Sequence, residues 1–299
     1  MDYMFKDVIS LKSVNMSTLN DTHVTSMIST FENCQNLESF IISGFIADEI
    51  KSMKKLFYKT SLINYNFGNL TINNIEDMSY MFAETPLQVI DFLNFNTENV
   101  IDMSYLFCNC SSLQEIDLKN LKTGKTQNMS HMFENIWSIS NLDLTSFDTK
   151  SVKDMSYMFK SFSYLLDIRI SNFNTELVED MSHMFEECMK LTSLDLKNFK
   201  TQKVRNMSHM FKNCYDLKSI DLTSFDISEV ENMSEMFSSC SSLYQIELKN
   251  FKTNKIKDIS YMFYDCVLLQ NIEMPNFDTS NVYNMSHIFE ECISLLVLD

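Results

Sequence analysis

Glycine and proline are scarce in this chain of 299 residues, which contains three glycines and two prolines. Enzymes of this size use both residues freely in turns and in loops that bind phosphate. The sequence has no glycine-rich phosphate loop, no zinc-finger spacing and no nucleophile elbow. Its turns must instead be formed by Asn, Asp, Ser and Thr, whose side chains hydrogen-bond to nearby backbone groups.

Basic residues are also few: 24 Lys and Arg stand against 40 Asp and Glu, for a formal net charge of −16. Nucleic acids and anionic membranes both attract basic surfaces, so we expect neither as a partner. No apolar stretch is long enough to span a bilayer, so we expect no membrane insertion. The first 15 residues lack the basic region and apolar run of a signal peptide, and no lipidation or sorting signal is visible.

A repeat of about 26 residues dominates the sequence. Its most regular mark is a phenylalanine that follows Met or another apolar residue and recurs at steps of 25 or 26, at Phe82, Phe107, Phe133, Phe159, Phe185, Phe211, Phe237, Phe263 and Phe289. The same spacing continues in degraded form to Phe57, Phe31 and Phe5. We therefore expect about twelve coils in one solenoid over residues 1–299, with degenerate repeats in 1–56 and regular repeats in 57–299.

The first half of each repeat has a helical pattern. Val100, Met103, Leu106, Phe107 and Cys110 recur at the spacing of one apolar helix face. The residue before the repeated Met is always a preferred helix N-cap, at Ser26, Ser52, Asp77, Asp102, Asn128, Asp154, Asp180, Asn206, Asn232, Asp258 and Asn284. These two signals predict that a short helix begins there in each coil.

The second half of each repeat has the alternation of a strand, as in Leu113, Ile116 and Leu118. A single coil cannot bury its own apolar face, whereas stacked coils can, with their strands paired in parallel about 4.8 Å apart. We therefore predict an α/β solenoid, a right-handed arc of the leucine-rich-repeat type, with one short parallel strand and one short helix in each coil.

The repeat, in stretches such as NMSHMFKNCYDLKSIDLTSFD (206–226), resembles the 26-residue tandem repeat of the BspA-like leucine-rich-repeat surface proteins. This resemblance implies a surface or lipoprotein adhesin at the cell surface or outside the cell. It implies no catalytic residues and no cofactor, since the family has no established enzymatic activity. The chain itself shows no secretion signal, lipobox cysteine or cell-wall anchor.

Seven of the eight cysteines share one position of the repeat: Cys34, Cys110, Cys188, Cys214, Cys240, Cys266 and Cys292. Other repeats carry Val8, Ile136 or Phe162 there, so the position is expected to be buried and apolar. Cys108 replaces a polar residue, and we expect it to be exposed. A cysteine-dependent enzyme built on Cys108 is a third hypothesis for function, although it would need a histidine and an oxyanion site nearby.

Four histidines share another position: His131, His183, His209 and His287. Tyrosine or glutamate occupies the position in other repeats, which favours a half-exposed amphipathic surface site. The alternative is a metal bound by His183 and His209, which lie in consecutive repeats.

An outward strand position is mostly acidic. It is occupied by Asn15, Ile41, Asn66, Asp91, Asp117, Asp143, Arg169, Asp195, Asp221, Glu247, Glu273 and Asp299. Stacking would place these side chains in single file, where like charges about 5 Å apart repel by about 0.8 kcal/mol per pair in water. Three interpretations stay open: a solvated face neutralised by Lys119, Lys197 and Lys249, a binding surface, or a row of divalent cations.

Among these, the candidate partner-binding residues are Asp91, Asp117, Asp143, Asp195, Asp221, Glu247 and Glu273. We predict a non-catalytic, adhesin-like scaffold that presents this acidic, concave strand face to a protein or glycan, itself basic or rich in hydroxyl groups. The alternative is an intracellular protein–protein interaction repeat with no surface role. Apolar strand edges at open ends are expected to favour end-to-end self-association.

Overall fold

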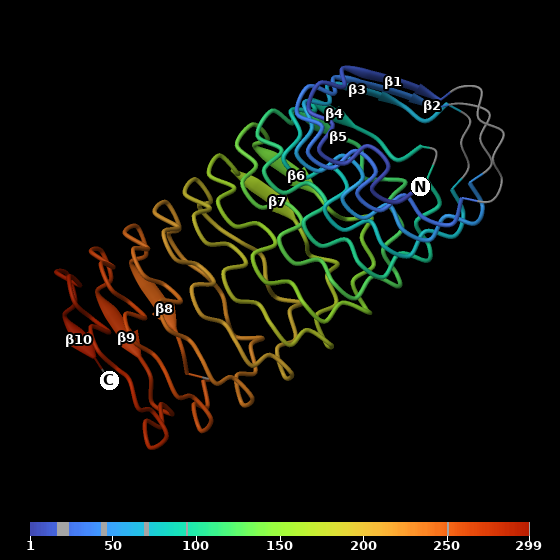
Figure 1. Cartoon of the computed structure of the whole chain (residues 1–299). Coiled ribbons are helices and arrows are strands. Elements are labelled where there is room, and N and C mark those ends of the chain that lie inside the picture. The colour runs from blue at the N-terminus through green and yellow to red at the C-terminus, as the bar shows by residue number, and fades with distance from the viewer. Residues whose placement is uncertain (17–23, 43–46, 69–71, 94, 250, 299) are drawn as a thin grey trace. The chain divides into compact units, whose positions relative to one another are not determined.

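The computed structural model describes residues 1–16, 24–42, 47–68, 72–93, 95–249 and 251–298, so Asp299 lies outside the described residues. The chain divides into two compact units, Met1–Ile139 and Ser140–Asp299, and each is a stack of coils (Figure 1). The regular elements of the described residues are short strands. The division into degenerate repeats at 1–56 and regular repeats at 57–299 stays a prediction.

The described residues of the first unit form five strands. They are β1 (Ser13–Met16), β2 (Ser39–Ile42), β3 (Asn64–Asn66), β4 (Val89–Ile90) and β5 (Glu115–Ile116). Strands β1, β2 and β3 lie side by side in one sheet, and β4 pairs with β5 in another (Figure 1). The register joins equivalent residues of successive repeats, for example Val14 with Phe40 and Phe40 with Tyr65.

The second unit contains the other five strands. They are β6 (Asn141–Asp143), β7 (Asp167–Arg169), β8 (Gln245–Glu247), β9 (Asn271–Glu273) and β10 (Val297–Leu298). Strand β6 pairs with β7, and β8, β9 and β10 form one parallel sheet in that order. Between β7 and β8, the repeats that contain Leu194 and Ile220 have no strand.

The structure is thus a β-solenoid of about ten turns, and two details of the predicted fold are wrong. The count of twelve coils is too high because the repeats of Leu194 and Ile220 carry no strand. The short helix of each coil is also wrong, because no helix occurs in the part of the chain that the structure describes.

A ribbon of consecutive turns replaces the helix. We call it the bridge segment, the nine residues from the predicted N-cap to the cysteine position, such as Asp180–Cys188. The amides of Met181, His183, Phe185 and Glu187 donate to carbonyls of the next coil at 2.8–3.0 Å, at Asn206, Ser208, Met210 and Lys212. The amides of Met184, Glu186 and Cys188 donate to the carbonyl three residues earlier. Because the neighbouring coil supplies acceptors, the segment needs no helical hydrogen bonds.

The predicted N-cap residues begin these turns. Asp180 Oδ1 accepts the Ser182 amide at 2.8 Å, as an N-cap would, but the backbone then turns left-handed at His183 (φ 58°) and again at Glu187 (φ 60°). A non-glycine residue in this conformation costs about 1–2 kcal/mol and cannot continue a helix. The N-cap hydrogen bond was therefore predicted correctly, but the helix that it was expected to start does not form.

The core of each unit is a stack of phenylalanine rings. Fully buried Phe185, Phe211, Phe237 and Phe263 follow one another with centroids 5.4–5.7 Å apart. Phe107 and Phe133 do the same in the first unit at 5.4 Å. Residues at the same position of successive repeats therefore lie next to one another within each unit, as predicted.

Candidate functional site

The predicted acidic residues lie on the outward strand face. Asp117, Asp143, Asp195, Asp221, Glu247 and Glu273 are exposed, and Asp91 is half-buried. The register pairs Asp143 with Arg169 and Glu247 with Glu273, and it places Asn15, Ile41 and Asn66 in line. Asp91 and Asp117 belong to the first unit and the other five to the second.

Each aspartate of this row also forms a local turn, which the sequence analysis missed. Asp143 Oδ1 accepts the amide of Thr145 at 3.0 Å and its hydroxyl at 2.6 Å, and Asp221 accepts the same two bonds from Thr223 at 3.0 and 2.7 Å. These hydrogen bonds lower the pKa of both carboxyl groups. The signal was present in the sequence as Asp followed two residues later by Thr or Lys.

Basic residues neutralise part of the row. Lys249 Nζ lies 2.9 Å from Glu273 Oε2, and Arg169 Nη1 lies 3.4 Å from Asp143 Oδ2. Exposed pairs of this kind contribute about 0–1 kcal/mol, so they relieve repulsion without fixing the fold. The turn hydrogen bonds and these pairs together explain how the fold tolerates the acidic row.

The strand face of the second unit is hollowed where the ladder is interrupted. Residues Ser219–Thr223 and Gln245–Glu247 line a depression of about 290 Å³. Its polar side chains come from Ser219, Asp221, Thr223, Gln245 and Glu247. The strand face of this unit is therefore not a uniform surface.

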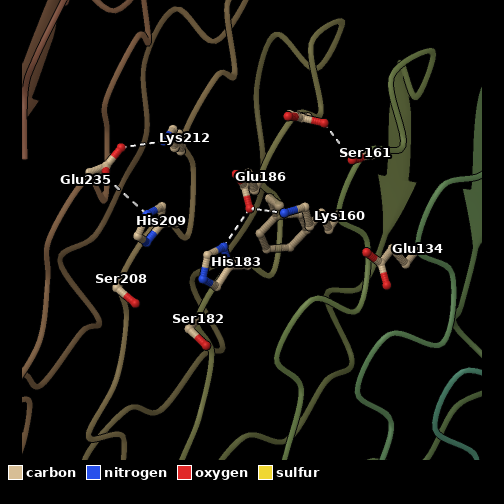
Figure 2. A network of polar contacts seen from close by, with 12 residues as sticks. Glu134, Lys160, Ser161, Ser182, His183, Glu186, Ser208, His209, Lys212 and Glu235 are labelled. Atoms are coloured by element: carbon tan, nitrogen blue, oxygen red, sulfur yellow. Dashed lines mark hydrogen bonds and ion pairs between the residues drawn. The ribbon is translucent and has the colours of Figure 1, made fainter.

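A polar network crosses the bridge segments of the second unit (Figure 2). His183 Nδ1 lies 2.6 Å from Glu186 Oε2, which Lys160 Nζ approaches to 2.8 Å. Burial alone would raise the pKa of Glu186, yet the hydrogen bonds from His183 and Lys160 outweigh it and lower the pKa to about 2. His209 and Lys212 lie in the next coil, and both contact Glu235 of the coil after it. The network stabilises charged groups that lie partly out of water.

His131, His183 and His209 are half-buried, as predicted, whereas His287 is exposed, and the rings of this position stack. Tyr157 lies over His183 at 4.1 Å and His183 over His209 at 4.3 Å, with 16° between the two imidazole planes. Nearly parallel rings point their nitrogen lone pairs in parallel directions, so His183 and His209 cannot share one metal ion. The described residues contain no group of three or more His, Cys, Asp or Glu placed to hold a metal.

The stability of the second unit should fall as the solution becomes mildly acidic. Burial and the neighbouring His183 lower the pKa of His209 from its usual 6.5. The unfolded chain then takes up this proton before the folded chain does, so the stabilisation is complete above pH 6.5 and is lost as the pH falls. We expect His209→Tyr, which installs the residue found at Tyr157, to reduce the drop in melting temperature between pH 7 and pH 5.5. An equal drop in melting temperature in the wild type and in His209→Tyr would contradict the lowered pKa of His209.

The shared cysteine position is buried, as predicted, in every repeat from Cys34 to Cys266, whereas Cys292 is half-buried and Val8 is exposed. Its thiols also form hydrogen bonds. Cys214 Sγ donates to the Phe185 carbonyl of the preceding coil at 3.1 Å, and Cys240 donates to Phe211 at 3.1 Å. Burial raises the pKa of Cys214 to about 12. These thiols act as packed, protonated donors that join neighbouring coils.

Cys108 is not the exposed thiol that the sequence predicted. Cys108 is only 5% exposed, and its Sγ lies 3.6 Å from Glu134 Oε2. Burial, followed by the negative charge of Glu134, raises the pKa of Cys108 well above its usual value. The prediction failed because it placed Cys108 on the outer face of a helix, whereas the bridge segment packs this position against the next coil. Burial and a raised pKa both disfavour the accessible thiolate that the cysteine-dependent hypothesis requires.

A family model matches nearly the whole chain. Successive matches cover residues 1–111, 52–165, 85–192, 127–245 and 190–296, and the family is described as "Mycoplasma protein of unknown function, DUF285". The chain belongs to this family. No curated protein matches this DUF285 chain.

Solved structures of bacterial leucine-rich-repeat proteins are similar to this DUF285 chain. A leucine-rich repeat protein from Bacteroides ovatus superposes with a TM-score of 0.52 at 18% identity, covering 99% of this chain and 80% of that one. A leucine-rich cell surface protein from Faecalibacterium prausnitzii gives a TM-score of 0.41 at 15% identity, covering 95% and 82%. The resemblance to BspA-like leucine-rich-repeat proteins, which the repeat predicted, is confirmed by the family and by the fold. No described segment forms a helix capable of crossing a bilayer.

Proposed function

We propose that this DUF285 chain is a non-catalytic scaffold that binds a protein or glycan partner through its strand face, in the manner of an adhesin. One observation carries the proposal: in the second unit the exposed acids of the strand face are held in a fixed geometry. Asp143 and Asp221 each keep one oxygen in a turn and remain exposed. A row of ordered charges needs little rearrangement to bind, which lowers the entropic cost of association.

The bridge segments favour a structural role over a binding role. Their amides and carbonyls are used between coils, and their Phe, Met and Cys side chains are buried. The strand face, by contrast, presents carboxylate, hydroxyl and amide groups to solvent. A basic or hydroxyl-rich partner complements these groups.

Three substitutions test the proposal. The triple variant Asp143→Asn, Asp195→Asn and Asp221→Asn removes charge from the strand face, while each Asn oxygen still accepts the turn hydrogen bond. We expect this variant to lose at least ten-fold in partner capture from a host extract, with its melting temperature nearly unchanged.

The chain offers a matched control for the triple variant. Asp148, Asp226 and Asp278 form the same kind of turn in the same unit, accepting the amides of Lys150, Ser228 and Ser280, but they lie off the strand face. Their replacement by Asn makes the same change in net charge and should leave capture intact. Equal capture by both variants would exclude the acidic row as the binding surface.

An intracellular interaction protein is the second candidate, and the thiols favour it. All eight cysteines are free, which is usual in a reducing compartment. Protease treatment of intact cells separates the two candidates. Cleavage of the chain would support the adhesin, and full protection would support the intracellular protein.

A further inference from the structure

The two sides of the second unit are held together differently. On one side the bridge segments pair without a break, from Asp154 through Asp180, Asn206, Asn232 and Asp258 to Asn284. On the other side the strand ladder stops after β7 and resumes at β8. The coils therefore stay stacked through their bridge segments, while the strand side keeps isolated backbone hydrogen bonds, from the Lys218 amide to the Thr192 carbonyl at 3.2 Å and from the Tyr244 amide to the Lys218 carbonyl at 3.4 Å. The hollow of about 290 Å³ lies where the ladder is interrupted.

The lining of this hollow is acidic and polar over an apolar floor. Asp221 and Glu247 occupy the same outward position in adjacent coils and are both exposed. Thr223 and Gln245 add hydroxyl and amide groups, and no Lys or Arg is among the lining residues.

The chain contains its own example of a basic group on this face. Arg169 extends from β7, and its guanidinium lies 3.4 Å from Asp143 Oδ2 on β6 and 3.9 Å from Asp167 Oδ2 on its own strand. Arg169 thus sits in the outward row and contacts a carboxylate of the adjacent coil. In the hollow, Asp221 and Glu247 present carboxylates from adjacent coils of the same row, and the nearby Lys197 and Lys249 lie outside the lining.

We propose that this hollow binds an arginine side chain from an extended segment of a partner protein, with the guanidinium between Asp221 and Glu247. The inference rests on the proposed function, because it names the partner of the same strand face. Arginine fits better than lysine, because its planar fork can donate to two carboxylates at once. A glycan could also hydrogen-bond to the hydroxyl and amide groups here, but its binding would not depend on the charges of Asp221 and Glu247.

Peptide titration against the full chain tests the arginine assignment. The probe is a fluorescein-labelled peptide of alternating Arg and Ser, compared with peptides in which Lys or the neutral isostere citrulline replaces Arg. We expect the Arg peptide to bind several-fold more tightly than the Lys peptide and at least ten-fold more tightly than the citrulline peptide. Its affinity should also fall as salt is raised from 0.05 to 0.5 M.

Two variants locate the binding. Asp221→Asn with Glu247→Gln should weaken the Arg peptide at least ten-fold. Asp226→Asn with Glu229→Gln makes the same charge change off the strand face and should leave binding unchanged. Equal binding by both variants, equal binding of the citrulline peptide, or a neutral oligosaccharide that displaces the Arg peptide would each overturn the arginine assignment. If the assignment fails while the strand-face triple variant still loses partner capture, the proposed function stands and only the ligand class is wrong.

Discussion

Replacing Phe185 by alanine is expected to lower the free energy of unfolding by about 3–5 kcal/mol. The ring is fully buried and stacks between Phe159 at 5.4 Å and Phe211 at 5.7 Å, so its loss leaves a cavity that faces two neighbouring coils. Guanidinium unfolding followed by circular dichroism measures the change.

The control for this variant is an exposed aromatic residue in the same unit. Tyr164 is 61% exposed, and Tyr164→Ala should change the free energy of unfolding by no more than about 0.5 kcal/mol. If Phe185→Ala changed the free energy of unfolding as little as Tyr164→Ala, the stacked rings would not be the core that joins the coils.

Proline at Tyr105 is expected to cost about 3 kcal/mol or more. Tyr105 has a φ of 58°, which the proline ring cannot adopt, and its amide donates to the Ser130 carbonyl at 2.9 Å. Proline therefore removes a bond between coils and also forces the ribbon out of its left-handed turn. Thermal melting of the variant measures the loss.

Glycine at the same position provides the comparison. Tyr105→Gly keeps both the left-handed φ and the amide, and it loses only the ring that stacks on Tyr80 at 4.1 Å and His131 at 4.0 Å. Loss of the two stacked pairs costs about 1–3 kcal/mol and relief of the left-handed conformation returns about 1–2 kcal/mol, so glycine should destabilise the protein less than proline does. In a helix that begins at Asp102, Tyr105 would lie in the first turn, where proline is tolerated. Equal stability of the two variants would therefore favour the helix.

The burial of each repeat position could be predicted from the sequence, because each coil contacts only its neighbours and places equivalent residues in equivalent surroundings. A position that accepts Cys214, Ile136 or Phe162 must be buried, and a position that accepts His183 or Tyr157 must be half-buried. Both predictions depend only on which residues replace one another in successive repeats. The family resemblance and the parallel strands followed from the same comparison.

The helix was mispredicted for a physical reason. The spacing of Val100, Met103, Leu106, Phe107 and Cys110 suits consecutive turns of three to four residues as well as it suits a helix. What decides between them is the supply of carbonyl acceptors from the next coil, a nonlocal contact that no single repeat reveals. Left-handed Tyr and His residues give no warning, since glycine is the usual sign of that conformation. The burial of Cys108 was missed for the same reason.

The candidate site was predicted only in part. The outward row of Asp117, Asp143 and Asp221 was found by register, but the turns formed by its aspartates were overlooked. The hollow could not be predicted, because the repeats of Leu194 and Ile220 have the same pattern as their neighbours and yet lack strand pairing. Small differences in packing between coils decide where the ladder is interrupted.

Amide hydrogen exchange of residues 181–187 tests most directly whether coils are joined through their bridge segments. The amides of Met181 and His183 donate to the next coil at 3.0 and 2.9 Å, so they should be protected as strongly as that of Phe185. A helix that begins at Asp180 would leave its first amides without intrahelical partners. Rapid exchange at Met181 and His183 together with protection at Phe185 would contradict the bridge segment and the stacking that depends on it.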